Sequence, residues 1–184
     1  APFIAVFLLL SFWKNSTENY YSEIMKNDLT EGRMAFEKQL DIMCAGAFSV
    51  SNDSDLKWVY FLDGLKDGDN NIAALIRCND MLRQTFADSE HYQNYSVIMK
   101  NELIFRKSGM VVGDKFFYDN YCTYQNTDFE TWRKQSFESN TWQLFPLEEI
   151  DTGERTFQAM TFSYPVRNYI QQEPEANAVV QFLL

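Results

Sequence analysis

Four acidic side chains in the middle of the chain could supply a pair of catalytic carboxylates: Asp114, Asp119, Asp128 and Glu130. Glycoside hydrolysis, for example, needs two carboxyl groups that face each other across the substrate. Capping of helix starts and solvation explain the same residues without any chemistry. We therefore predict no catalytic residue, and a carboxylate-based hydrolase ranks below the binding functions considered next.

The cysteines and the histidine also argue against catalysis and metal binding. Cys44, Cys78 and Cys122 are widely spaced, and His91 is the one histidine of the chain. A zinc site of the usual kind needs four Cys or His ligands at short spacings. The acidic segment 66–71 lacks the spacing and the closing glutamate of a calcium loop. We therefore expect no metal and no cofactor.

An aromatic group with one arginine is the better candidate for a functional site, as a ligand-binding site. Binding pockets are mostly apolar and aromatic, with a few polar groups that fix the orientation of the ligand. Such a wall would suit a sugar or a small carboxylate. The alternative is a purely structural role, in which most of the aromatic residues belong to the core and the arginine lies on the solvent face of its strand. The candidates are Arg106, Tyr118, Tyr121, Tyr124, Trp132 and Trp142.

The composition limits the partners. The chain has 184 residues, of which 46% are hydrophobic and 16% aromatic, so it can bury a core and form one domain, with or without an appendage. Its formal net charge is -10. Binding to phosphate groups needs clustered Lys and Arg, so we predict that this chain itself binds no nucleic acid.

A hairpin over residues 95–107 is the clearest predicted element. Two β-branched and aromatic runs flank a short polar turn, which is typical of two antiparallel strands. Further strands are predicted near 141–145, 156–164 and 178–184. Everything before residue 90 is predicted to be helical, and we expect the strands to form a sheet in residues 91–184.

The helices that position these strands are predicted from periodicity. One long helix is expected from Asn15 to about Val50, with two shorter helices broken at Gly32 as the alternative. Its apolar stripe, at steps of three and four, consists of Tyr21, Met25, Leu29, Gly32, Phe36, Leu40, Met43 and Ala47. This stripe would suit packing on a domain or a homodimer through the long helix.

Shorter elements are predicted between the hairpin and the later strands. Residues 109–113 are expected to form a loop and 116–121 a short aromatic helix. Thr127 with Glu130 matches a capping box at the start of a second helix. Residues 142–146 are predicted to be an edge strand that ends at its proline.

The N-terminal segment from Pro2 to Trp13 is uncharged and almost wholly apolar. It is too short by itself for a hydrocarbon core of about 30 Å. Three explanations are open: the outer end of a transmembrane helix, the apolar part of a signal peptide, and a buried helix. The expected division is a membrane anchor over 1–14, helices over 15–90 and the sheet domain over 91–184.

This order of elements resembles the extracellular Cache-type (PAS-like) sensor domains of membrane-bound bacterial regulators, most of all AraC-type transcription factors. The resembling features are FLLLSFW before a long helix, the hairpin over 95–107, the helix string Phe129-Glu130-Thr131-Trp132-Arg133, the strand Thr161-Phe162-Ser163-Tyr164-Pro165 and the apolar strand 179–183. Amino-acid-binding relatives use an Arg-Trp pair, and because the order here is Trp132-Arg133, that motif does not carry over.

The resemblance implies an α+β fold, with a long N-terminal helix before a PAS-like domain built on an antiparallel sheet of about five strands. It implies an extracytoplasmic sensor in the cell membrane that binds a small-molecule ligand or an extracellular protein, transmits a signal through the long helix and is not an enzyme. A protein-interaction or adhesion module without a small ligand is the alternative.

Overall fold

The computed structural model describes residues 2–59, 68–86, 92–167 and 176–184. The chain divides into two compact units, Ala1–Ile42 and Met43–Leu184, which are described separately. His91 and residues 66–67 of the acidic segment 66–71 fall outside the described residues, whereas residues 68–71 of that segment begin helix α3 (Gly68–Phe86).

A single helix makes up the first unit and continues to the start of the second. This helix, α1 (Pro2–Ser51), is unbroken at Gly32, so the prediction of one long helix is confirmed and the alternative of two helices is wrong. Tyr21, Met25 and Leu29 are largely exposed on it. Among the described residues, no helix combines the length and the apolar character needed to cross a membrane.

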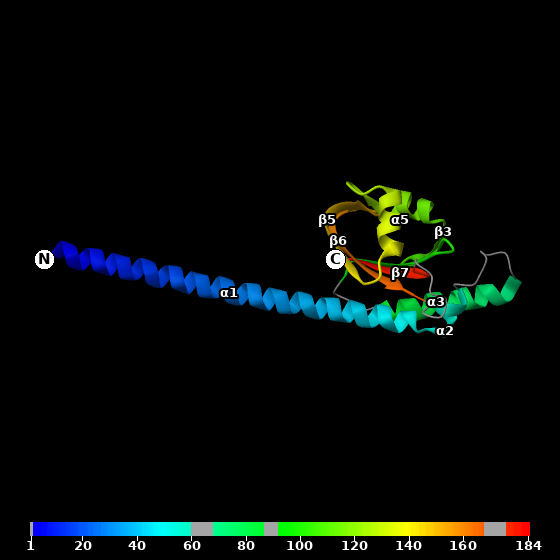
Figure 1. Ribbon diagram of the computed structural model, residues 1–184, viewed down its shortest axis with the longest axis horizontal. Coiled ribbons are helices and arrows are strands. Elements are labelled where there is room, and N and C mark those ends of the chain that lie inside the picture. The colour runs from blue at the N-terminus through cyan, green and yellow to red at the C-terminus, as the bar shows by residue number, and fades with distance from the viewer. Residues whose placement is uncertain (1, 60–67, 87–91, 168–175) are drawn as a thin grey trace. The chain divides into compact units, whose positions relative to one another are not determined.

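The second unit is built on one antiparallel sheet of seven strands, two more than predicted (Figure 1). The order across the sheet is β3-β2-β1-β7-β6-β5-β4, and every neighbouring pair is antiparallel. The strands are β1 (Asn94–Met99), β2 (Leu103–Arg106), β3 (Gly109–Val112), β4 (Thr123–Tyr124), β5 (Gln143–Asp151), β6 (Thr156–Val166) and β7 (Ala178–Leu183).

The extra strands are short segments at the two edges of the sheet. The predicted hairpin is confirmed as β1 and β2, but the predicted loop 109–113 is wrong, because most of it pairs with β2 as β3. The other edge is β4 rather than β5, and β5 continues through Pro146 to Asp151. Its pairing with β6 shifts between Phe145 and Glu148, so an irregularity in the ladder accommodates the proline.

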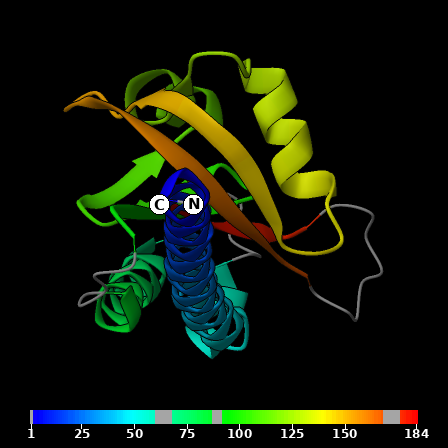
Figure 2. The same ribbon diagram turned by 90° about the vertical axis from the view of Figure 1, so that its left-hand side faces the viewer.

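Helices cover both faces of this sheet (Figure 2). On one face lie α2 (Ser54–Val59), α3 (Gly68–Phe86) and the end of α1 that belongs to this unit. Phe86 packs against Tyr95 and Phe182, at ring-centroid distances of 4.8 and 5.2 Å. The other face carries α4 (Asp114–Tyr121) and α5 (Phe129–Glu138) and is called the α4–α5 face below.

The α4–α5 face buries its own aromatic core. Side chains of α4 and α5 pack with alternate residues of the strands, including Ile98, Ile104 and Val179. Asp128 caps α5 by accepting a hydrogen bond from the Thr131 N–H at 2.8 Å, so the predicted Thr127 capping box is wrong. The carboxylate is the acceptor at this helix start, one residue further along the chain.

Candidate functional site

The sequence-predicted binding residues separate into two groups in the structure. Tyr118, Tyr124 and Trp132 are buried together in the core of the α4–α5 face. The Tyr118 ring lies 6.3 Å from that of Tyr124 and 5.4 Å from that of Trp132, between centroids. Trp142 is 47% exposed and stacks on Phe162. The Phe162 ring contacts Phe182, which packs against Phe86 on the other face of the sheet, so Trp142 does not join the other candidates.

Arg106 lies on the α4–α5 face at the end of β2, two residues after Ile104 of the core. Only 8% of it is exposed, so the expectation of a solvent-facing arginine is wrong. The guanidinium carbon lies 3.8 Å from the centroid of the Tyr121 ring on α4. A cation over an aromatic face is held by the quadrupole of the ring, most strongly where water is excluded.

Polar residues continue from Arg106 across the sheet in one cross-strand row. The register pairs Arg106 with Ser96, Ser96 with Gln181, and Gln181 with Ser163. Because facing residues of neighbouring strands point to the same side, the row lies on the α4–α5 face. Gln181 is anchored there by donating from Nε2 to the Ser136 hydroxyl of α5 at 2.8 Å.

A pocket of about 330 Å³ opens at the Arg106 end of this row. It lies where the start of β1, the end of β2 and the turn between β5 and β6 meet. Its lining residues are Gln93, Asn94, Arg106, Lys107, Ser108, Thr152, Glu154, Arg155 and Phe157. Its volume is at the small end of the range for ligand sites, about 300 to 1,000 Å³.

The charge of this pocket is opposite to that of the chain. Arg106, Lys107 and Arg155 line it together with one carboxylate, Glu154, in a protein whose formal net charge is -10. Cationic side chains around a hollow with low-dielectric walls concentrate anions there. The pocket is therefore suited to a negatively charged group.

Arg106 has hydrogen-bonding capacity to spare within this pocket. Its Nη2 lies 3.9 Å from the Glu154 carboxylate, beyond the usual length of about 2.7 to 3.2 Å for an N–H···O hydrogen bond. The Glu154 side chain is 79% exposed, so this pair is loosely held. Among the described residues, no side chain or backbone oxygen accepts a hydrogen bond from the Arg106 guanidinium.

Arg155 joins the turn to the far side of the pocket. Its Nη2 donates to the Gln93 Oε1 at 3.0 Å, and its guanidinium carbon lies 4.8 Å from the centroid of the Phe157 ring. Gln93 precedes β1, whereas Arg155 precedes β6, and β7 lies between those two strands. The contact therefore closes the pocket across the curved end of the sheet.

The turn that carries Glu154 is held by hydrogen bonds within the turn and by its close approach to α4. Thr152 donates from both its N–H and its hydroxyl to the Arg155 carbonyl, at 3.1 and 3.0 Å. Gly153 has a φ of 75°, and a Cβ there would lie 2.3 Å from the Asn120 carbonyl oxygen of α4. Only glycine fits this approach without a shift, so Gly153 sets the position of Glu154 against α4.

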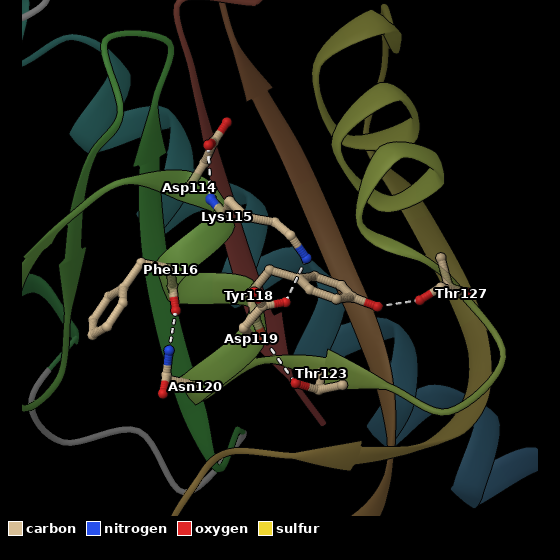
Figure 3. Close-up of polar contacts among 8 residues, drawn as sticks. All are labelled: Asp114, Lys115, Phe116, Tyr118, Asp119, Asn120, Thr123 and Thr127. Carbon is tan, nitrogen blue, oxygen red and sulfur yellow. Dashed lines mark hydrogen bonds and ion pairs between the residues drawn. The ribbon is translucent and has the colours of Figure 1, made fainter.

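Hydrogen bonds along α4 fix the helix that carries Tyr121 (Figure 3). The Tyr118 hydroxyl donates to the Thr127 carbonyl, and the Thr123 hydroxyl donates to the Tyr118 carbonyl at 2.9 Å. Lys115 Nζ pairs with the Asp119 carboxylate at 2.6 Å on the outer side. The end of α4 is thus tied to the segment leading into α5.

The interior beneath α4 and α5 is suited to neutral groups only. Burial raises the pKa of the Cys122 thiol to about 12, and burial also raises the pKa of the Tyr124 phenol well above its usual value. The Tyr124 and Thr161 hydroxyls are hydrogen-bonded to each other at 2.9 Å. A charged ligand group therefore fits the Arg106 pocket and not the interior of the core.

Three of the four acidic residues considered for catalysis have structural partners. Asp114 pairs with Arg133 and joins α4 to α5, and Asp119 pairs with Lys115. Hydrogen bonds from the α5 start lower the pKa of Asp128. Each of these three contacts stabilises a helix or a helix pair.

Sequence reasoning identified Arg106 and its aromatic partner Tyr121 but missed the other residues that line the pocket. Lys107, Glu154 and Arg155 are exposed and lie in turns, where charged residues are ordinary. The feature that brings them together is the strand order, because the β5–β6 turn meets β2 only when β1 and β7 lie between β2 and β6.

A scan against protein-family models and a search of the curated proteins each gave no match to this chain.

Proposed function

We propose that this chain is an extracytoplasmic sensor domain of a membrane-anchored regulator of signal transduction or transcription. In this proposal the sheet domain binds a small molecule and α1 transmits the signal. The observation that carries it is the pocket around Arg106, where a buried guanidinium presents unfilled donors to a hollow of about 330 Å³. Guanidinium donors that face a hollow are available to the acceptor groups of a ligand.

The helix arrangement supports a route for the signal. The stripe that is exposed at Met25 and Leu29 continues along α1 to Met43 and Ala47, which are buried in the second unit. The steps of four, four and three add to an 11-residue repeat, which keeps the stripe nearly straight along the helix. A change in the packing of Met43 and Ala47 would therefore act on the same helix face that we expect a partner to contact.

Signal transmission in this proposal needs two states of different ligand affinity. The resemblance to Cache-type sensors supplies the expected setting: a membrane anchor in the apolar segment 2–13, an extracellular sheet domain and a homodimer through the long helix. The alternative is a protein-interaction module without a small ligand, and the exposed apolar side chains of α1 favour it.

A thermal-shift screen of the whole chain against sugars, amino acids and small carboxylates tests the proposal. A ligand at 100 times its dissociation constant stabilises the native state by about 2.7 kcal/mol, which raises the melting temperature visibly. Arg106→Gln is the matched variant, and its shift with the same ligand should be much smaller. Equal shifts in both proteins would place binding elsewhere, and a screen without any hit would favour the interaction module.

A further inference from the structure

We infer that the Arg106 pocket takes a small organic dianion, with Glu154 as an internal carboxylate that the ligand displaces. This inference rests on the proposed function and names the ligand class for the same site. It starts from the lining, where three cations surround a single carboxylate. Glu154 leaves Arg106 but stays in the lining, so the three cations and this carboxylate keep a net charge of +2, which two negative charges on the ligand match.

The placement of Glu154 is that of a weak substitute for a ligand. Its carboxylate is the anionic group nearest to the buried Arg106 among the described residues, yet it stops at 3.9 Å. A carboxylate that bound Arg106 in the usual bidentate way would come within about 2.7 to 2.9 Å. Gly153 and the Thr152–Arg155 hydrogen bonds hold the turn that carries Glu154 and so keep its carboxylate at this distance. A free ligand is not attached to the turn and can therefore approach Arg106 more closely.

The orientation of Arg106 fits recognition of a planar acid group. Its guanidinium carbon lies 3.8 Å from the centroid of the Tyr121 ring, so the ring backs the guanidinium on one side, and its five N–H donors can bind a carboxylate or phosphate in a bidentate way. Arg155 is similarly backed by Phe157 and held by Gln93. Two braced guanidinium groups at one pocket suit two acid groups on one ligand.

The ligand is expected to be organic and not a bare inorganic ion. The pocket offers hydrogen-bonding groups besides its charges, from Asn94 and Ser108, and an aromatic wall from Phe157. A dicarboxylate and a phosphate ester share the required chemistry, and the test distinguishes them.

Calorimetric titration of the whole chain with succinate, glycerol phosphate and the neutral succinamide tests the inference. Each is compared between the unmodified protein, Glu154→Gln, Arg155→Gln and Arg106→Gln. We expect a dianion to bind and succinamide not to bind. Glu154→Gln should tighten the binding about fivefold, because the ligand no longer has to displace a carboxylate that lies 3.9 Å from Arg106, and a charge pair at that distance in water is worth about that factor. Arg106→Gln should weaken it about tenfold or more.

The control for charge is Glu149→Gln, which changes the net charge of the chain equally but does not line the pocket. It should leave the affinity within about twofold, since screened charges outside the site contribute little. Glu154 and Arg155 are exposed, so their variants remain informative even if Arg106→Gln fails to fold.

Three outcomes decide the matter. A dianion that binds more tightly to Glu154→Gln and no differently to Glu149→Gln supports the inference, and the better of the two probes identifies carboxylate or phosphate chemistry. A neutral compound whose binding depends on Arg106 would overturn the dianion while keeping the sensor. No dianion binding to any of these proteins, at concentrations below those where salt alone alters stability, would also overturn it.

Discussion

The guanidinium carbon of Arg106 lies 3.8 Å from the centroid of the Tyr121 ring, which joins the end of β2 to the end of α4. This contact has two consequences. It offsets part of the cost of burying the Arg106 charge, and it holds the guanidinium at the end of α4. The pocket is therefore shaped by an aromatic residue that is not itself among its lining residues.

Replacing Tyr121 tests this role of the ring. Tyr121→Leu should lower the free energy of unfolding by about 1 kcal/mol or somewhat more, because it removes a largely desolvated cation–π contact. Tyr121→Phe keeps an aromatic face and should cost much less. Urea denaturation of both variants measures the difference. If the two variants were equally destabilised, the ring face would have no part in holding Arg106.

Gly153 gives a second test, of how the β5–β6 turn is placed. Gly153→Ala should destabilise the protein by about 1 to 3 kcal/mol, because the residue has a positive φ and its new Cβ would meet the Asn120 carbonyl oxygen. Gly113→Ala is the matched control, since Gly113 has a φ of 96° and its added Cβ would meet only the Phe116 Cβ, at an ordinary van der Waals distance of 3.6 Å. Equal losses of stability would mean that the turn does not rest on α4.

The elements that were predicted correctly are those that a local pattern specifies. The unbroken α1 follows from apolar residues at steps of three and four, and the β1–β2 hairpin follows from two β-rich runs around a polar turn. In contrast, β3 and β4 are only four and two residues long. They are strands because of their pairing partners, so no window of sequence reveals them.

The site shows the same division. Arg106 was a candidate because of its residue type, but its burial was missed because all four residues of β2 are buried and no polar alternation marks its solvent face. Arg155 and Glu154 could not be connected with Arg106 from the sequence. Their meeting depends on the order of five strands across the sheet, and that order is a property of the whole fold.

The buried thiol of Cys122 predicts a loss of stability at alkaline pH. Its pKa is about 12 in the native protein, because of burial, and 9.0 for an unperturbed thiol. Below pH 9 both states are protonated and this group adds no pH dependence. Between pH 9 and 12 the unfolded thiol loses its proton while the native thiol keeps it, so unfolding is favoured by up to about 1.4 kcal/mol per pH unit.

Urea denaturation below pH 9 and between pH 9 and 12 measures this effect. Cys122→Ala should show a shallower loss of stability over the alkaline range than the unmodified protein. Cys78→Ala should do the same independently, because burial also raises the pKa of Cys78 to about 12. Parallel pH profiles for the unmodified protein and both variants would show that these thiols do not remain protonated in the native state.

The exposed stripe of α1 predicts association through this helix. In the proposed homodimer, Met25 and Leu29 pack against a second copy, so Met25→Glu combined with Leu29→Glu should convert a dimer to monomers. Two charged side chains at the centre of an apolar seam are costly to desolvate, and like charges from both copies repel. Light scattering coupled to size-exclusion chromatography measures the mass directly.

Met34 provides a control of the same residue type on the opposite side of α1. It is 62% exposed, close to the 64% of Met25, but it lies about 200° around the helix from Gly32 of the stripe, at about 100° per residue. Met34→Glu therefore introduces the same charge as Met25→Glu alone, with which it is compared, at a position outside the seam and should leave the mass unchanged. If both substitutions disrupt the dimer, the cause is the added charge and not the stripe. If the unmodified chain is a monomer at every concentration tested, the stripe must be covered by a different partner, and the signal would have to reach α1 without a second copy.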